Sequence, residues 1–301
     1  MTSPRNYADV ITIVVNWNLK EETTRCLESL EKSSLPSRVV LVDNGSLDGS
    51  APYIEKHFPE VDIIRLDSNI GFGRACNLAI RRVLAEGQSR FIFLLNNDAV
   101  VHPQAMARLV EAAYSNPTAG ILGPKIYYRH DPSQIWYAGA RMRRGVLAAA
   151  DTGRGQIDTG QFEIPRQVDY VFGAAMLVQL EIFERIGFFD ERFFIYLEDL
   201  DFCLRAQQAG FSLLFVPQAH VWHSGSASTT RYKRMRRYHH LRSTVIFLVK
   251  HLSPVWILPA TAFWGAVLLR SLGRDLLAAN PALHWGAFPS RNGRQRGPSV
   301  R

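Results

Sequence analysis

Short apolar runs alternate with amphipathic stretches through the first 120 residues of the chain. The apolar runs are rich in Val, Ile, Leu and Phe, which predicts buried strands; they lie at 10–15, 38–42, 61–66 and 91–95. Apolar positions with helical spacing follow each run, and the predicted helices lie at 21–32, 51–58, 74–85 and 103–115. Strands that alternate with helices predict an α/β fold, with a mostly parallel, Rossmann-like sheet flanked by helices.

The next hundred residues follow a less regular pattern. Strands are predicted at 121–128, 136–142, 168–180 and 211–216. Residues 143–167 are polar and rich in glycine, which is typical of a mobile loop. The predicted helices at 181–186 and 197–209 end at Gly187 and Gly210, as helices commonly end at glycine.

The last seventy residues are strongly basic. The chain has a formal net charge of +8, and residues 231–301 contain 13 of its 35 Lys and Arg residues but only one acid, Asp275. Such a segment is suited to an anionic partner, either lipid headgroups or nucleic acid. An uncharged stretch, 252–269, follows the first basic residues and is interrupted by Pro254 and Pro259. Its length is at the lower edge for a membrane-spanning helix, which needs roughly 17–25 residues.

Two arrangements fit this uncharged stretch, a pair of interfacial or re-entrant helices and a buried helical hairpin. Trp256 and Trp264 are suited to a membrane interface, so we expect an anionic membrane surface as the partner and no nucleic acid. The alternative for the basic residues is a solvated helix. The predicted division is an α/β domain at 1–230 (halves 1–120 and 121–230), a membrane-associated helical extension at 231–290, and a disordered tail at 291–301.

Composition excludes other classes of protein. Hydrophobic residues make up 47% of the chain, which is too high for a disordered protein. The three cysteines, Cys26, Cys76 and Cys203, are widely spaced and predict core thiols in a reducing compartment. Because the N-terminus lacks an apolar signal core, we expect a cytoplasmic protein at the inner face of the membrane.

Polar residues follow each predicted strand of the first half. The run 91–95 stops at Asn96-Asn97-Asp98, and the run 38–42 stops at Asp43. Ligands of open α/β sheets bind beyond the carboxyl ends of the strands, so Asp98 is expected at the lip of a cleft. Carboxylate and amide oxygens there suit Mg²⁺ or Mn²⁺ carrying a diphosphate. The alternative is a simple Asx turn after a strand.

Three acids, Glu198, Asp199 and Asp201, stand at the start of a predicted helix. Negative charge is favourable at a helix N-terminus, and this accounts for one or two of them. It does not account for the aromatic and apolar segment that precedes them, Phe193-Phe194-Ile195-Tyr196. A second functional centre is therefore predicted here.

Five motifs together resemble glycosyltransferase family 2, the inverting enzymes with the GT-A fold, and within it the bacterial rhamnosyltransferase-like branch. They are V-V-N-W-N at 14–18, V-D-N-G-S-L-D-G-S at 42–50, N-I-G-F-G-R-A-C-N at 69–77, L-N-N-D at 95–98 and G-F-F-D-E-R-F-F-I-Y-L-E-D-L-D-F-C-L-R at 187–205. Each motif is weak alone, but they occur in order over roughly residues 8–250. The resemblance implies a transferase that uses a nucleotide-diphosphate sugar.

The resemblance also implies a donor site. Asp43 would accept a hydrogen bond from the imide N–H of uracil or thymine, with Asn16 and Asn18 in the same base pocket, and Arg74 would add positive charge beside the diphosphate. The implied nucleotide-sugar-binding residues are Val15, Asn16, Asn18, Asp43, Asn69, Gly71, Arg74, Asn77, Asn96 and Asn97. Turn formation is the alternative role for Asn16, Asn18 and Asp43.

The family's metal-binding D-x-D pattern falls on Asn96-Asn97-Asp98. Asn96 replaces its first acid, which weakens the expected metal affinity, since fewer charged ligands bind more weakly. Asp98 is the implied metal ligand, and His223 matches a second ligand of some relatives; its alternative is a structural histidine.

The resemblance makes Asp199 the general base that deprotonates the acceptor hydroxyl, with Glu198 orienting the acceptor or acting in its place. Asp201 is expected to brace Arg205, four residues on. Gly173, Ala174 and Trp136 are the implied acceptor-binding residues. Trp136, Tyr137 and the loop at 143–167 are also candidates for closing over the donor.

The resemblance implies an inverting, metal-dependent transfer of a sugar from a dTDP- or UDP-sugar to a hydroxyl of a polysaccharide or lipid-linked saccharide, with rhamnose as the leading candidate for the sugar. A non-catalytic nucleotide-sugar or membrane-binding protein of the same fold is the alternative, because Asn96 replaces an acid. A nucleotide-dependent oxidoreductase is disfavoured, because G-F-G-R-A-C-N lacks the third glycine of the dinucleotide fingerprint.

Overall fold

The computed structural model describes residues 9–87, 89–143, 145–225 and 233–266. The chain divides into two compact units, residues 1–252 and residues 253–301. The first unit contains the sheet and the cavity, and the fold described below belongs to it.

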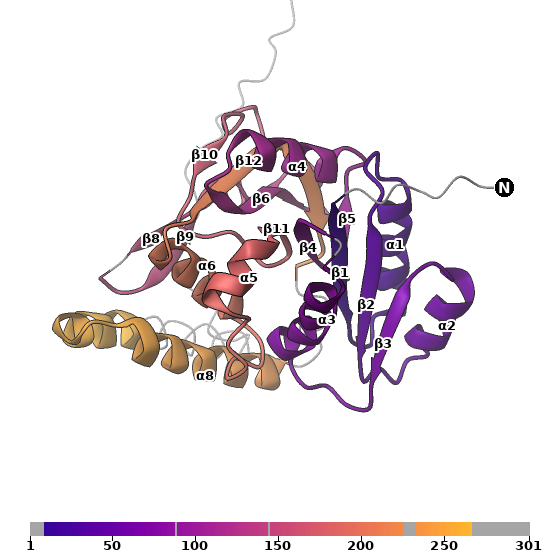
Figure 1. Ribbon diagram of the computed structural model, residues 1–301. Helices are drawn as coiled ribbons and strands as arrows, with labels where there is room; N and C mark the ends of the chain where they lie inside the picture. The colour runs from indigo at the N-terminus through magenta and orange to yellow at the C-terminus, as the bar shows by residue number, and fades with distance from the viewer. Residues whose placement is uncertain (1–8, 88, 144, 226–232, 267–301) are drawn as a thin grey trace, which may run out of the picture. The chain divides into compact units, whose positions relative to one another are not determined.

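One large mixed sheet forms the centre of the first unit (Figure 1), in the order β10-β12-β6-β11-β4-β1-β2-β3. Its strands are β1 (Val10–Asn16), β2 (Arg38–Asn44), β3 (Asp62–Leu66), β4 (Phe91–Asn96), β6 (Ala119–Tyr128), β10 (Arg166–Gln167), β11 (Ala175–Gln179) and β12 (Ser212–His223). Two short strands, β5 (Ala99–Val101) and β7 (Ile135–Tyr137), pair with β12 and β6. The strands β1 to β4 are parallel, whereas β11 runs antiparallel between β4 and β6.

Helices flank this sheet, as the alternating pattern predicts. They are α1 (Lys20–Glu31), α2 (Ser50–His57), α3 (Phe72–Glu86), α4 (Ala105–Ser115), α5 (Leu180–Ile186) and α6 (Glu198–Gln208). The helix α3 packs on β1 and β2 through a fully buried face that includes Ala75, Ala79 and Ile80. The predicted α/β architecture is therefore observed, and the predicted elements of the first 120 residues are confirmed within one or two residues at most boundaries.

Strand register explains why the polar strand ends converge. Asn16 at the end of β1 pairs with Asp43 of β2, and Val15 pairs with Asn96 of β4. Because parallel strands run in one direction, their carboxyl ends share one edge of the sheet. Residues up to 81 positions apart in sequence therefore meet there.

The middle of the chain differs from the prediction in three places. The predicted strand 136–142 is two strands in different sheets, because Gly139 turns the chain at φ 89° between β7 and β8 (Ala140–Arg143). The predicted loop 143–167 contains β9 (Ala148–Asp151), which pairs with β8, and β10. Of the predicted strand 168–180, only Ala175–Gln179 pairs as β11.

An ion cluster anchors the loop that the sequence predicted to be mobile. The ammonium of Lys125, on β6, is fully buried and lies 2.9 Å from Asp158 and 2.5 Å from Glu163, both in the loop. The Tyr127 hydroxyl donates a second bond to Asp158, at 2.6 Å. A buried ammonium needs such partners, so this part of the loop is held against the sheet.

The basic helix α8 (Lys233–His251) belongs to the first unit, so the boundary lies after residue 252 and not after residue 230. Its side chains bind the segment before α6 and α6 itself. Lys250 lies 2.7 Å from both Asp190 and Asp201, and His251 lies 2.7 Å from Asp201. Asp201 also accepts a bond from Arg205 at 2.8 Å, as predicted.

The described part of the second unit is a short 3₁₀ turn, Pro254–Trp256, followed by helical residues 257–266. Within the described residues, no helix is both long enough and apolar enough to cross a membrane. The remainder of the uncharged stretch, 267–269, and the predicted tail at 291–301 lie outside the described residues.

Candidate active site

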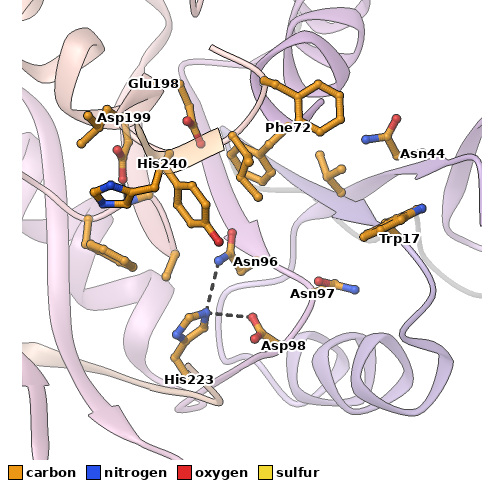
Figure 2. Close-up of a pocket in the computed structure, with 18 of the residues that line it drawn as sticks. Trp17, Asn44, Phe72, Asn96, Asn97, Asp98, Glu198, Asp199, His223 and His240 are labelled. Atoms are coloured by element: carbon orange, nitrogen blue, oxygen red, sulfur yellow. Dashed lines mark hydrogen bonds and ion pairs between the residues drawn. The ribbon is translucent and has the colours of Figure 1, made fainter. Parts of the chain in front are cut away.

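A cavity of about 250 Å³ opens at the carboxyl edge of the parallel strands (Figure 2). Strand ends and the start of α3 contribute Val15, Trp17, Asn44, Asn69, Phe72, Asn96, Asn97 and Asp98. The approaches to β11 and α6, the end of β12 and α8 contribute Tyr170, Phe172, Gly173, Ala174, Phe194, Ile195, Tyr196, Leu197, Glu198, Asp199, His223, Met235 and His240. Asp98 and Asp199 therefore line the same cavity.

Asp98 and His223 form one corner of the cavity. The Nε2 of His223 lies 2.8 Å from Oδ1 of Asp98 and 3.2 Å from the Asn96 amide nitrogen, as the dashed lines of Figure 2 show. Strand pairing produces this contact, because β5 begins one residue after Asp98 and its Ala99 pairs with His223 of β12. The imidazole is also stacked on Trp136, at 4.0 Å between ring centroids.

The chemistry of this corner fits a hard divalent cation. Two neighbouring ligands of an octahedral Mg²⁺ at about 2.1 Å lie roughly 3 Å apart, close to the observed spacing of the carboxylate and imidazole atoms. Both side chains are buried, Asp98 at 4% and His223 at 1% exposure, and both border the cavity. Within the described residues no group of three or more His, Cys, Asp or Glu side chains could hold a metal, so a cation here would take its other ligands from the substrate or water.

A buried amide network supports the floor of the site. Asn16 is fully buried and donates to Asp43 at 2.7 Å and to Ser50 at 2.7 Å. Its side-chain oxygen accepts from Thr23 at 2.7 Å and from Asn97 at 3.1 Å. This network fixes the ends of β1, β2 and β4 to one another, which keeps the edge of the cavity rigid.

The Asp199 carboxylate is held by three donors at the first turn of α6. Its Oδ2 accepts from the Tyr170 hydroxyl at 2.6 Å and from the Gly173 N–H at 2.8 Å, and its Oδ1 accepts from the Leu200 N–H at 2.8 Å. Burial raises the pKa of Asp199 above its ordinary value, while these hydrogen bonds oppose that rise. The carboxylate is therefore fixed in orientation and is more basic than an exposed aspartate.

The backbone just before Glu198 is strained. Tyr196 and Leu197 adopt φ of 72° and 67°, a left-handed conformation that non-glycine residues seldom adopt twice in succession. Two neighbours hold the segment: the Phe72 N–H of α3 donates to the Phe194 carbonyl at 2.8 Å, and the Ser243 hydroxyl of α8 donates to the Ile195 carbonyl at 2.9 Å. The strain is thus maintained by the surrounding fold and sets the direction of the acid pair.

Comparison with known proteins agrees with this geometry. The family described as Glycosyl transferase family 2 matches residues 9–187, more than half of the chain. The chain belongs to glycosyl transferase family 2. It is a glycosyltransferase with the GT-A fold.

Two curated relatives extend along most of the chain. The N-acetylglucosaminyl-diphospho-decaprenol L-rhamnosyltransferase of Mycobacterium tuberculosis is 31% identical over 285 residues, covering 87% of this chain and 92% of the relative. The rhamnosyltransferase WbbL of Escherichia coli K12 is 25% identical, over 80% of this chain and 93% of its own length.

Two solved structures show the fold. The mannosyltransferase PcManGT of Pyrobaculum calidifontis, solved with GDP-Man and Mn²⁺, aligns with a TM-score of 0.59 at 16% identity, over 94% of this chain and 84% of that one. GalNAc-T7, solved with UDP, GalNAc and Mn²⁺, aligns with a TM-score of 0.59 at 18% identity, over 73% of this chain but only 44% of its own.

The cavity brings together only part of the residue set that the family resemblance implied. Those that line it are Val15, Asn69, Asn96, Asn97, Asp98, Gly173, Ala174, Glu198, Asp199 and His223. Asn16 and Asp43 lie beneath it in the amide network, and Asn18 accepts a backbone bond from Leu47. Of these three, Asp43 also makes a turn contact of the kind that the alternative interpretation expected, because it accepts from the Ser46 N–H at 3.2 Å.

Four other predicted site residues have their side chains or backbone engaged elsewhere. Arg74 and Asn77 bind Glu191, at 3.0 and 3.2 Å, and Asn77 also donates to the Phe189 carbonyl. Gly71 adopts φ 96°, and an added Cβ would meet the Phe194 carbonyl at 2.6 Å. Trp136 is 5% exposed behind His223, and Tyr137 is fully buried, so neither ring is placed to close over a ligand.

Several lining residues were not identified from sequence. Tyr170 donates a hydrogen bond to Asp199, and the only feature that marks it in the sequence is its position shortly before the Gly173-Ala174 pair. Met235 and His240 come from α8, which the sequence analysis assigned to a separate extension. Trp17 and Asn44 belong to the quoted motifs, so their position after a strand was the available signal.

Changing Gly173 to Ala should displace the Asp199 carboxylate and lower turnover without disturbing donor binding. A Cβ at this position would lie 2.8 Å from Oδ2 of Asp199 and 3.0 Å from its Cβ, so the carboxylate must move. We expect kcat to fall roughly 10- to 100-fold, since small misplacements of a catalytic group have effects of this size. Steady-state kinetics should show an unchanged KM for the donor; a variant with wild-type kcat would contradict the close contact.

Changing Ser243 to Ala should lower kcat through the strained segment. The Ser243 hydroxyl is buried and holds the Ile195 carbonyl, so its loss releases the residues before Glu198. We expect a several-fold lower kcat and a loss of about 1 kcal/mol in the free energy of unfolding. Thr244→Ala is the matched control, because its hydroxyl bonds only within α8, to the His240 carbonyl at 2.8 Å. Equal effects of the two changes would refute this positioning role.

Proposed function

We propose that this glycosyltransferase transfers a sugar from a dTDP- or UDP-sugar to a hydroxyl of a lipid-linked saccharide, with inversion at the anomeric carbon. Rhamnose is the first candidate for the transferred sugar. The observation that carries the proposal is the placement of Asp98 with His223 and of Asp199 around one cavity, on a family 2 fold. The curated relatives named above are rhamnosyltransferases, and the name of one includes a decaprenol-linked acceptor. This supports the choice of sugar and of acceptor class.

The reaction is a single displacement. The acceptor hydroxyl oxygen attacks the anomeric carbon while the bond from that carbon to the diphosphate oxygen breaks, and Asp199 takes the hydroxyl proton. The three hydrogen bonds from Tyr170, Gly173 and Leu200 keep the Asp199 carboxylate aimed at the acceptor. The products are the glycosylated acceptor and a nucleoside diphosphate, and the proton leaves Asp199 to solvent.

Asp98 and His223 are the residues that would hold Mn²⁺ or Mg²⁺ beside the diphosphate. The bound cation would neutralise charge on the leaving group. The two solved neighbours were crystallised with Mn²⁺ and nucleotide or nucleotide sugar, which supports a cation of this kind. Asn96 presents an amide where the family pattern has an acid, so the site carries one negative charge fewer.

The outer face of α8 supports binding at a membrane surface. Tyr238, Leu241, Val245 and Val249 recur at helical spacing and are 63%, 48%, 53% and 81% exposed. Arg236, Arg237 and Arg242 are exposed beside them. An apolar stripe with basic flanks is suited to an anionic bilayer. Because Met235 and His240 of the same helix line the cavity, a lipid-borne acceptor would reach the site along α8.

A donor panel tests the reaction. The protein is incubated with Mn²⁺, a polyprenyl-diphosphate saccharide acceptor and each of dTDP-rhamnose, UDP-glucose and UDP-N-acetylglucosamine, and released nucleoside diphosphate is measured. We expect acceptor-dependent release with dTDP-rhamnose above all. Failure to turn over any nucleotide sugar would favour the non-catalytic alternative.

Vesicle co-sedimentation tests the membrane surface. A Val245→Ser, Val249→Ser double variant should bind phosphatidylglycerol vesicles several-fold more weakly than the unchanged protein. Ile164→Ser is the control, because Ile164 is 76% exposed in the loop anchored by Lys125, away from α8 in sequence. Equal binding by all three proteins would exclude this face of α8 as the contact.

A further inference from the structure

Glu198 carries a buried oxygen that has no protein partner. Its Oε2 is inaccessible and makes no hydrogen bond within the described residues. The side chain is 6% exposed and lines the cavity, and Figure 2 shows its carboxyl group directed toward the interior. A buried polar atom without a partner is unfavourable, so a native structure that retains one points to a missing ligand.

The surroundings of Glu198 disfavour its ionised form. Asp199 is its neighbour on α6, and the Cys76 thiol faces it from α3. The other titratable groups that line the cavity are Asp98, Tyr170, Tyr196, His223 and His240. The structure gives Glu198 no ion pair with Lys, Arg or His within the described residues. Burial, followed by the negative charge of Asp199, raises the pKa of Glu198 well above its ordinary value.

A neutral carboxyl group needs an acceptor for its one O–H donor. Asp199 does not serve as this acceptor in the structure: its oxygens accept from Tyr170, Gly173 and Leu200, and Oε2 of Glu198 makes no hydrogen bond to it. The remaining direction for the Glu198 carboxyl is the cavity.

The positions of the diphosphate and of the attacking hydroxyl indicate which oxygen the Glu198 carboxyl would contact. On the proposed function, the diphosphate lies at Asp98 and the attacking hydroxyl lies at Asp199, so the transferred sugar must lie between them. Glu198 precedes Asp199 on the same turn and faces this space. We propose that Glu198 acts as a neutral carboxylic acid and donates a hydrogen bond to a hydroxyl oxygen of the transferred sugar, making it a residue that selects the donor.

Substitutions at Glu198 separate this role from that of a base. Glu198→Gln retains a donor of similar shape, so kcat/KM should stay within about 3-fold of the unchanged enzyme, whereas Glu198→Ala should lose roughly 10- to 100-fold. Donor analogues that each lack one sugar hydroxyl identify the partner. The unchanged enzyme should discriminate against one analogue, and Glu198→Ala should no longer do so. A Glu198→Gln enzyme as inactive as Glu198→Ala would overturn the proposal.

Melting temperature gives a readout that does not depend on turnover. If folded Glu198 stays protonated while unfolded Glu198 ionises above its ordinary pKa of 4.5, the folded state binds more protons. Stability of the unchanged protein then falls as the pH rises above that value, and Glu198→Gln lacks this loss. The melting temperature of Glu198→Gln should therefore exceed that of the unchanged protein by an amount that grows from pH 5 to pH 8.

A difference that stays constant with pH would mean that Glu198 is ionised in the fold, and would refute the proposal. This measurement uses the protein alone, so it stands even if the donor panel shows no transfer. Failure of the proposed function and failure of the Glu198 assignment are thus distinguishable.

Discussion

Asp199→Asn should abolish sugar transfer while leaving the donor bound. The amide cannot accept the acceptor proton, and general-base catalysis contributes about 10²- to 10⁴-fold in rate. The Tyr170 hydroxyl and the Gly173 N–H can still donate to the amide oxygen, whereas the Leu200 N–H loses its acceptor. We therefore expect the local structure to persist with a small loss of stability. Turnover is measured as nucleoside diphosphate release, and donor binding by titration calorimetry.

Asp158→Asn is the control for this prediction. Asp158 is also a partly buried acid with three donors, Lys125, Tyr127 and the Gly160 N–H, but it lies in the anchored loop and does not line the cavity. We expect it to lower stability and to keep turnover per folded molecule. Loss of donor binding by a folded Asp199→Asn protein would argue that Asp199 holds the substrate instead of accepting a proton.

The rate of the unchanged enzyme should rise with pH on its acidic limb. The base acts in its ionised form, and burial raises the pKa of Asp199 above its ordinary value of 3.8. The limb should therefore lie at higher pH than an exposed aspartate would give, and it should be absent from the residual activity of Asp199→Asn. A pH profile of kcat/KM that is flat from pH 4 upward in the unchanged enzyme would contradict the assignment of Asp199.

The strand ends that border the cavity could be predicted from sequence because their signals are local. Apolar runs that stop at Asn16, Asp43 and Asn96 are visible in the sequence, and parallel strands place their carboxyl ends on one edge. The order of the strands was less accessible. The antiparallel strand β11 enters between β4 and β6 by long-range pairing that no periodicity encodes.

The rest of the cavity depends on long-range contacts that cannot be inferred from local sequence patterns. The three-residue strand β5 is too short to show a period, yet its pairing with β12 places His223 beside Asp98. The left-handed conformation of Tyr196 and Leu197 has no compositional signal, because glycine is absent there. The basic composition of α8 indicates an anionic partner, but it gives no sign that one face of the helix is buried. Ser243 and Phe247 lie on that face and pack into the first unit.

Asp98→Asn should remove cation binding and with it most of the activity. Asp98 supplies the one carboxylate of the candidate cation site, since the first acid of the family pattern is Asn96. Loss of groups that merely support a metal ligand reduces affinity or activity about 10- to 100-fold, so loss of the charged ligand itself should exceed this. Mn²⁺ binding in the presence of dTDP is measured by electron paramagnetic resonance, which does not require turnover.

Asn96→Asp makes the opposite change at the same corner. It restores a carboxylate near Nε2 of His223, which lies 3.2 Å from the present amide nitrogen. Affinity rises with the number of charged ligands, so we expect tighter Mn²⁺ binding and activity at lower Mn²⁺ concentration. If Asp98→Asn binds Mn²⁺ as well as the unchanged protein does, the cation lies elsewhere. Asp98 would then serve to orient His223 and would not be a ligand of the cation.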